Sequence, residues 1–518
     1  MRVKTTLFGA SALVMALVGA PSTTTAQAAS NACDQRTNNT YKKLLECVTL
    51  EGAREHQWEL QKIADANNGN RTSGTSGYDA SADYAVEVFE DAGLEVSVQE
   101  FVFQTFIKLS PTVLERVSPA PAGAIETAVM SYSGSGDVTA PVSSPSAVTG
   151  CSPTDFAGFT QGDIALISRG ACTFAAKANN ADAAGAAGVV IYNNIPGALN
   201  GTLGSTFTAD LPVTSVTQAV GQELAAVSDL TLRLKADTFR GEATTSNVIA
   251  ETPWGNPDNV VMVGAHLDSV NEGPGIQDDG SGVAGILETA QNMRKSNGVN
   301  QVRFALWGAE ESGLVGSTYY VDNLPQVERD KVALYLNFDM IGSPNHVFFV
   351  YDGDDSDGVG AGPGPEGSDQ IEKLFESYYA GTGNSWKGTD FSGRSDYGPF
   401  IAEGVDIPSG GLFTGAEGIK TPQEAEIWGG TAGEQYDPCY HLACDDYDNI
   451  NLEAFDVNVD AIAFSTLTYA YSTESVNGEK GKKVPGGPSG GSGSSGAAGY
   501  PGGSSGGLHS DEHEHVSE

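Results

Sequence analysis

Acidic and histidine side chains gather at four points of the sequence, where a predicted strand ends or a predicted helix begins. They follow the apolar runs VVMVGA, VRFALWG and ALYLNF or lie in the loop GPGIQDDGSG: His266, Asp268, Asp278, Asp279, Glu310, Glu311 and Asp339. Each group alone has an ordinary explanation, because carboxylates are common in turns and at helix N-termini. Their occurrence together favours catalysis, since α/β sheets form sites where their strands end.

A second histidine turns these carboxylates into a strong candidate metal site. Of the seven histidines, three lie in the last ten residues, and His56 and His346 fit ordinary surface or core positions. That leaves His266 and His441, and His441 lies between two cysteines in the string DPCYHLACDD. Two histidines and three carboxylates are enough ligands for two metal ions.

The ligand types favour zinc. Zinc prefers nitrogen and oxygen ligands in four-coordinate sites, and two neighbouring ions need a ligand between them. Asp278 is the candidate for that shared ligand, because a carboxylate has two oxygens. The same ligand types also suit cobalt and manganese.

An α/β domain is needed to bring these residues together. From about residue 242 onward, apolar runs that predict strands alternate with predicted helices at residues 283–296, 313–323, 368–379 and 452–471. Such alternation predicts a mixed, largely parallel sheet that helices cover on both faces. Earlier in the chain, helical patterns at residues 31–66 and 81–92 precede an alternating strand pattern at residues 94–103.

A second domain interrupts this pattern. Between residues 108 and 238, short β-rich runs alternate with Gly, Pro and Ser, and long helical periodicity is scarce. We therefore expect a small β-rich domain at 108–238, inserted into an α/β domain of residues 29–107 and 239–475. Residues 476–518 are rich in Gly and Ser and predict a disordered tail.

The N-terminus has the pattern of a secretory signal peptide. Arg2 and Lys4 precede the small, apolar residues 7–20, and the Ala-Gln-Ala of residues 26–28 fits a cleavage site. We therefore expect a secreted protein that starts after residue 28. Three Asn-x-Thr acceptors, Asn38, Asn70 and Asn200, would carry glycans in a eukaryotic host.

Six cysteines in an exported chain predict disulfide bonds. Fifteen connectivities are open, and the one that joins neighbours in the sequence pairs Cys33 with Cys47, Cys151 with Cys172 and Cys439 with Cys444.

The net charge of −39 disfavours nucleic acid and anionic membranes as partners. After the signal, no apolar run reaches the length of a membrane span, so we expect a soluble monomer.

The ordered strings HLDSV, GPGIQDDGSG, WGAEESGLVGS, LNFDMIGSPN and DPCYHLACD resemble the secreted di-zinc leucyl aminopeptidases of bacteria and fungi. The resemblance covers roughly residues 40–475. It includes the inserted region, where TDFAGFTQGDIALISRGACTFAAKANN is similar to a protease-associated domain. The implied fold is a zinc-exopeptidase-like α/β domain with this insertion.

The resemblance implies a role for each residue of the candidate site. One zinc would bind His266 and Asp339, the other Glu311 and His441, with Asp278 as the bridge. Glu310 would be the general base, Asp268 would orient His266, and Tyr440 would stabilise the oxyanion. The peptide bond between Asp278 and Asp279 is expected to be cis.

Substrate and calcium contacts are implied in the same way. Met340 and Phe413 match apolar positions of the substrate pocket, although core packing explains them equally well. Arg394 would contact substrate or form a structural ion pair. Asp456 and Asp460 resemble a calcium site of some relatives, against the alternative of a solvated helix face.

Together these residues predict removal of the first residue, leucine or another large apolar one, from peptides with a free N-terminus. The attacking group would be a water activated by two zinc ions, with a glutamate base. The same fold also serves carboxypeptidases and glutaminyl cyclases, and receptor-like homologues that lack activity. A carboxypeptidase would need a cationic clamp for the substrate carboxylate, for which Arg394 is the candidate.

Overall fold

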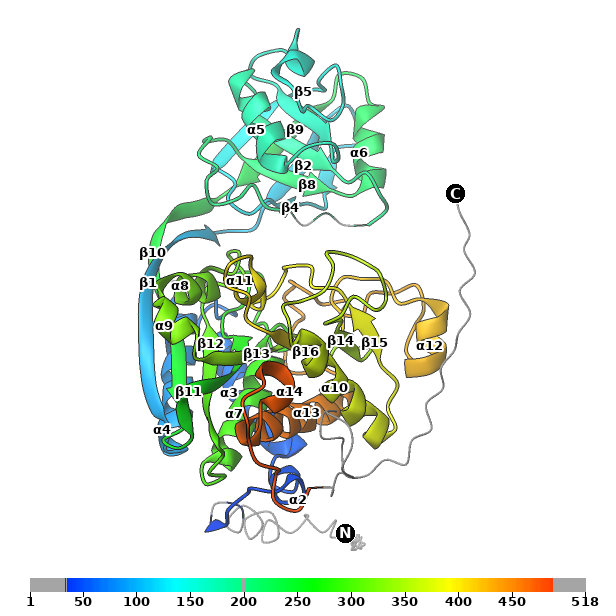
Figure 1. Cartoon of the computed structure of the whole chain (residues 1–518). Coiled ribbons are helices and arrows are strands. Elements are labelled where there is room, and N and C mark those ends of the chain that lie inside the picture. The colour runs from blue at the N-terminus through cyan, green and yellow to red at the C-terminus, as the bar shows by residue number, and fades with distance from the viewer. Residues whose placement is uncertain (1–32, 34, 198, 200, 488–518) are drawn as a thin grey trace, which may run out of the picture.

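The computed structural model describes residues 33, 35–197, 199 and 201–487, which form two units joined by a long two-stranded ribbon (Figure 1). The larger unit is built on an eight-stranded sheet. In order across the sheet its strands are β1 (Glu95–Lys108), β10 (Thr238–Glu251), β12 (Asn300–Trp307), β11 (Asn256–His266), β13 (Val332–Phe338), β16 (Ser409–Phe413), β14 (Phe349–Tyr351) and β15 (Lys387–Thr389).

The four central strands of this sheet, β12, β11, β13 and β16, run parallel, and β10 and β14 flank them in the antiparallel direction. Alternate residues of a strand point to opposite faces. In β11, Val261 and Val263 belong to one hydrophobic cluster, while Val260 and Met262 belong to another. Both faces are therefore buried, which is why the strands are apolar throughout.

Helices cover both faces of the sheet (Figure 1). The larger cluster contains residues of α3 (Leu50–Ala66), α4 (Ser76–Asp91), α7 (Gly280–Met293), α10 (Ser368–Thr382) and α13 (Leu452–Tyr471). The cluster on the other face contains residues of α8 (Val315–Asn323) and α11 (Gly398–Ile401). The short helices of this unit are α2 (Tyr41–Leu45), α9 (Gln326–Arg329), α12 (Pro422–Trp428) and α14 (Glu474–Asn477).

The smaller unit contains a second eight-stranded sheet. Its strands, in order across the sheet, are β3 (Gly123–Ile125), β2 (Val113–Ser118), β9 (Thr231–Ala236), β5 (Gly136–Ser143), β6 (Ile164–Ser168), β7 (Gly188–Tyr192), β8 (Val213–Val216) and β4 (Ala128–Val129). Its helices are η1 (Pro153–Phe156), α5 (Phe174–Ala183) and α6 (Gln218–Ala225).

Strands β1 and β10 connect the two units. They pair along their whole length, but β10 pairs with β12 only at residues 248–251, so the rest of the ribbon extends beyond the sheet (Figure 1). Near its far end, Lys108 Nζ lies 2.8 Å from Glu272 Oε1 in the loop after β11. This ion pair connects the ribbon to the loop that leads into the candidate site.

The fold class agrees with the expectation, but two boundaries do not. Among the described residues of 31–66, the predicted helical pattern is interrupted between α2 and α3, where Thr49 caps α3 by accepting a hydrogen bond from Gly52 N–H. The predicted tail at 476–518 starts too early, because Val476 and Val484 are buried in the main core. The remainder of that tail, from residue 488, and the signal segment lie outside the described residues.

Three disulfide bonds join Cys33 to Cys47, Cys151 to Cys172 and Cys439 to Cys444, which is the sequence-local pairing. Within the part of the chain that the structure describes, no helix combines the length and hydropathy needed to cross a bilayer.

Two of the three glycan acceptors are poorly placed. The amide nitrogen of Asn38 donates to Asn292 O at 2.9 Å, and that of Asn70 to Asn271 O at 3.4 Å, and both side chains are buried. A glycan at Asn38 or Asn70 would require these buried side chains to give up their hydrogen bonds, and Asn200 lies outside the described residues.

Candidate metal and catalytic site

Three parallel strands deliver the candidate ligands to one edge of the sheet. His266 is the last residue of β11, Asp339 follows β13, and Glu310 and Glu311 come shortly after β12. Because parallel strands end on the same side of a sheet, these side chains meet there. Asp278 lies two residues before α7, next to its N-cap Asp279, and the peptide bond between the two aspartates is cis, as expected.

Asp278 lies between the two histidines. Its Oδ1 is 3.0 Å from His266 Nε2, and its Oδ2 is 3.2 Å from His441 Nε2. On one side, Asp339 Oδ1 lies 3.7 Å from His266 Nε2, and on the other, Glu311 Oε2 lies 3.1 Å from His441 Nε2. Two triads of candidate ligands therefore share the carboxylate of Asp278.

The donor set fits a pair of zinc ions. Asp278 Oδ2 and Glu311 Oε1 are buried and make no hydrogen bond in the described structure. A buried carboxylate oxygen without a donor is costly, and a cation between the oxygens would offset that cost. On the far side of the His266 ring, Nδ1 lies 3.0 Å from the main-chain oxygen of Asp268, which leaves Nε2 free to bind a metal.

The electrostatics of the site also favour cations. Burial alone lowers the pKa of His266, but the surrounding carboxylates, Glu310 first among them, raise it well above its usual value. The pKa of His441 is raised in the same way, chiefly by Glu311 and Asp278. The same negative charge that favours protonated histidines here would also attract metal cations.

Glu310 has the environment expected for a base. It lines the cavity beside the two triads, and burial raises its pKa well above the usual value, with Asp396 and Glu311 adding to the effect. Its main-chain N–H donates to Asp268 Oδ1 at 3.1 Å. The residue is thus fixed by its backbone while its carboxylate faces the cavity.

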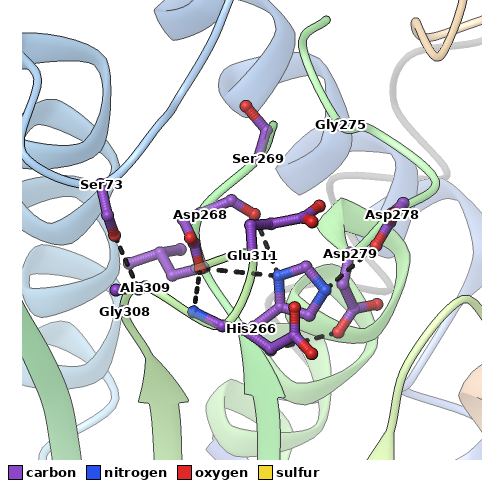
Figure 2. Close-up of polar contacts among 12 residues, drawn as sticks. Ser73, His266, Asp268, Ser269, Gly275, Asp278, Asp279, Gly308, Ala309 and Glu311 are labelled. Atoms are coloured by element: carbon purple, nitrogen blue, oxygen red, sulfur yellow. Dashed lines mark hydrogen bonds and ion pairs between the residues drawn. The ribbon is translucent and has the colours of Figure 1, made fainter. Parts of the chain in front are cut away.

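Asp268 contacts His266 differently from the expectation. The carboxylate Oδ1 is 3.7 Å from His266 Nδ1, beyond hydrogen-bond distance, and the main-chain carbonyl is the nearer acceptor (Figure 2). Because Glu310 N–H donates to the same carboxylate, the Asp268 side chain holds the loop that carries Glu310. Asp268 therefore positions both residues, one through its main chain and one through its side chain.

The remaining predicted residues line one cavity of about 320 Å³ next to the ligands. They are Met340, Phe413, Arg394 and Tyr440. The Tyr440 ring stacks on His441 with centroids 3.8 Å apart, and Arg394 Nη2 lies 3.5 Å from its hydroxyl. Arg394 Nη1 also pairs with Glu417 Oε1 at 2.8 Å, so its charge is balanced.

Three residues of the site have left-handed backbone conformations that non-glycine residues rarely adopt. They are Ala309, directly before Glu310, Met340, directly after Asp339, and His441 itself, with φ of 56°, 56° and 59°. Each costs on the order of 1–2 kcal/mol and needs support from its surroundings. Strained backbone therefore lies next to Glu310, next to Asp339 and at His441.

Several supporting residues have no assigned role in the sequence-based expectation. Buried Arg71 donates to the main-chain oxygens of Leu267, Pro274 and Gly275, the loop between His266 and Asp278. Ser395 Oγ donates to Asp339 Oδ2 at 2.5 Å. No local pattern in the sequence reveals such contacts.

Among the described residues, no third potential ligand joins Asp456 and Asp460 at the predicted calcium site. Asp456 and Asp460 lie on α13 and belong to none of the clusters of three potential metal ligands found among the described residues. Burial, together with the neighbouring charge of Asp456, raises the pKa of Asp460 to about 7. His56 and His346 lie outside those clusters as well.

Known peptidases resemble this chain along most of its length. Residues 247–466 match the model of peptidase family M28, and residues 136–224 match that of the PA domain. The chain is 46% identical over 450 residues to an aminopeptidase of Pseudomonas aeruginosa, covering 84% of this chain and 83% of that protein. A probable leucine aminopeptidase 2 of Aspergillus fumigatus is 46% identical over 357 residues, 68% of this chain and 70% of that protein. Among solved structures, a zinc aminopeptidase from Bacillus subtilis is 26% identical with a TM-score of 0.60, covering 83% of this chain and 97% of that chain.

Proposed function

Because the chain belongs to peptidase family M28, we propose that it is a secreted aminopeptidase that uses two zinc ions to remove large apolar first residues from peptides. The observation that carries the proposal is the position of Asp278, with one carboxylate oxygen toward each histidine at 3.0 and 3.2 Å. Neighbouring metal ions need such a shared ligand. The relatives' names support the zinc and the preference for leucine.

In this proposal His266 and Asp339 hold one ion, Glu311 and His441 hold the other, and Asp278 contacts both. When bound, the ions supply a water of lowered pKa and polarise the substrate carbonyl. Glu310 accepts the proton of that water and later delivers it to the leaving amine. The raised pKa of Glu310 supports this role, because a carboxylate of higher pKa is the stronger base and takes up the proton more readily.

Tyr440 and the apolar side chains of Met340 and Phe413 complete the proposed site. The Tyr440 hydroxyl donates to the oxygen that becomes negative as the carbonyl is attacked. The carboxylates around the ligands attract the free α-amine of the substrate, which makes the reaction an exopeptidase reaction. Met340 and Phe413, which line the cavity, contact the first side chain.

The pairing of Arg394 disfavours the carboxypeptidase alternative. A clamp for a substrate carboxylate needs an unbalanced positive charge. Arg394, the candidate for that clamp, already pairs with Glu417 at 2.8 Å. An amine-binding role for the acidic site is therefore the better supported one.

The proposal includes the organisation of the chain. We propose that residues 1–28 direct export, that 29–107 and 239–475 form the peptidase domain, and that 108–238 form a protease-associated domain. Three disulfides are compatible with an extracellular location. The enzyme is proposed to act as a monomer without nucleic-acid or membrane partners. A calcium ion at Asp456 and Asp460 would offset the burial, and the smaller repulsion by Asp456, that raise the pKa of Asp460.

A paired substrate assay tests the proposal. Leucine p-nitroanilide should be hydrolysed, whereas its N-acetylated form and N-blocked peptides with a free carboxylate should not. Metal analysis should find two zinc ions per chain, and a chelator should abolish the activity until zinc is restored. Turnover of only the blocked peptides would replace the proposal with a carboxypeptidase.

A further inference from the structure

Asp445 binds three consecutive main-chain amides at the loop that carries Asp278. Its Oδ1 accepts a hydrogen bond from Gln277 N–H at 2.9 Å, and its Oδ2 accepts one from Asp278 N–H at 3.1 Å. Its main-chain carbonyl accepts a third from Ile276 N–H at 3.1 Å. One residue therefore fixes the backbone of the Asp278 loop.

Asp445 belongs to the loop that carries His441. It directly follows Cys444, whose disulfide with Cys439 closes a short ring around His441. Another close approach joins the same two loops, because a Cβ at Gly273 would lie only 2.2 Å from Leu442 O. Both contacts, at Leu442 and at Asp445, lie on the C-terminal side of His441 and hold this loop against the Asp278 loop.

A buried polar network holds Asp445 itself. The amide nitrogen of Asn449 donates to Asp445 Oδ1 at 3.1 Å and to both oxygens of Asp437, at 3.1 and 3.2 Å. Asp437 Oδ1 also accepts from Cys439 N–H at 2.8 Å. Both aspartates are buried, so their hydrogen bonds are strong and costly to break. The network therefore fixes both ends of the disulfide ring.

We propose that Asp445 is a positioning residue that fixes Asp278 relative to His441 and thereby sets the affinity of the site for its metal ions. The inference rests on the proposed function, because it takes Asp278 and His441 as metal ligands. Their facing atoms, Asp278 Oδ2 and His441 Nε2, are 3.2 Å apart and come from loops that meet through Asp445. A shift of either loop changes the separation of ligands that must serve one ion.

The variant Asp445→Asn tests the role with little change in shape. The amide replaces one acceptor oxygen with an NH₂ group, so the N–H of Gln277 or of Asp278 loses its acceptor and faces a donor. We expect the affinity for zinc to fall by about 10–100-fold, the usual effect of losing a group that supports metal ligands. Competition between the metal-free protein and a chromophoric chelator for zinc alone measures this affinity.

Asp448→Asn is the matched control, because it makes the same change of charge three residues away at an exposed position. Its zinc affinity should equal that of the parent protein. A merely structural role for Asp445 would lower the melting temperature of the metal-free protein but leave the zinc affinity, measured far below that temperature, unchanged. That pattern would overturn the inference.

Asn449→Ala provides a second test if Asp445→Asn does not fold. Removing the amide leaves two buried carboxylates facing each other and displaces Asp445, so we expect at least a threefold loss of zinc affinity. An unchanged affinity in this variant would overturn the inference. A parent protein that binds two zinc ions and hydrolyses leucine p-nitroanilide keeps the proposed function intact in either case, whereas a parent that does neither removes both.

Discussion

Glu310 is held in place by its neighbours before any substrate arrives. Ala309, which precedes it, has φ of 56°, and its N–H donates to Ser73 Oγ at 2.7 Å (Figure 2). The N–H of Glu310 itself donates to Asp268 Oδ1. These contacts leave the carboxylate of Glu310 as the part of the residue that is free to act in the cavity, which is the arrangement that a general base needs.

Replacing Glu310 with Gln should lower kcat by about a hundredfold or more, because the amide cannot accept the proton of the attacking water. The zinc content should stay at the parent level, since Glu310 is not a proposed ligand. Steady-state kinetics with leucine p-nitroanilide and metal analysis measure the two effects. Glu403→Gln, at an exposed position, is the control, and full activity in Glu310→Gln would remove this residue from the mechanism.

The candidate ligands could be picked out of the sequence because they are histidines and carboxylates that follow apolar runs or lie in two distinctive loops, and the structure brings them together. Residues that support them could not be predicted. Arg71 and Asp445 bond to main-chain atoms, and a main-chain partner leaves no trace in the residue types. For the same reason, the sequence could suggest that Asp268 orients His266 but could not show that its carbonyl is the nearer acceptor.

At the scale of elements, α12 controls one wall of the substrate cavity. Glu424, in its first turn, accepts hydrogen bonds from the Tyr436 hydroxyl and from Lys387 Nζ, both at 2.8 Å. The Tyr436 ring lines the cavity and meets Phe349 edge to face, with centroids 5.5 Å apart. A Cβ at Gly415 would lie 2.4 Å from this ring, so a side chain there would displace it.

Tyr436→Phe should therefore weaken the preference for a large first residue. Without the hydroxyl the ring loses its bond to a charged carboxylate, worth about 1.5–3 kcal/mol, and its orientation is less constrained. We expect the ratio of kcat/KM for leucine over alanine p-nitroanilide to fall about three- to tenfold. Tyr319→Phe, on α8, controls for loss of a tyrosine hydroxyl elsewhere. An unchanged ratio would mean that Tyr436 does not shape the pocket.

Element boundaries were predictable where a cap and a continuous apolar pattern coincide. The helix at Leu452–Tyr471 has the predicted bounds, and the Asn451 side chain caps it by accepting from Ala454 N–H. The packing of residues 476–484 was not predictable, because the Gly- and Lys-rich residues around Val484 look like a linker. Only the fold shows that this valine reaches the main core.

At the scale of the whole molecule, a buried group of titratable residues connects the N-terminal helices to the centre of the fold. Glu288 on α7 accepts from Thr49 N–H at 3.0 Å and lies 3.9 Å from His56 Nε2 on α3. His56 Nδ1 in turn lies 2.6 Å from the Tyr84 hydroxyl on α4. Burial raises the pKa of Glu288 to about 7 and lowers that of His56 to about 4.

These two pKa shifts act on stability in opposite directions. The folded state holds the Glu288 proton more tightly than the unfolded chain, so this residue favours folding most at low pH, and its contribution declines as pH rises from about 4.5 to about 7. The folded state binds the His56 proton less tightly, so stability is lost as pH falls from about 6.5 to about 4. Lowering the pH should therefore reduce the free energy of unfolding through His56, and raising the pH should reduce it through Glu288.

Glu288→Gln separates the two effects. The amide oxygen can still accept from Thr49 N–H, but it has no charge to bury, so the variant should resist urea better than the parent at pH 8. The gain is at most about 3 kcal/mol, from a shift of roughly 2.5 pKa units at 1.36 kcal/mol each, and it should vanish near pH 4.5. Midpoints of urea unfolding for zinc-loaded protein across this range measure the difference. A variant that is less stable than the parent at pH 8 would show instead that ionised Glu288 pairs with a protonated His56 and holds α3 against α7.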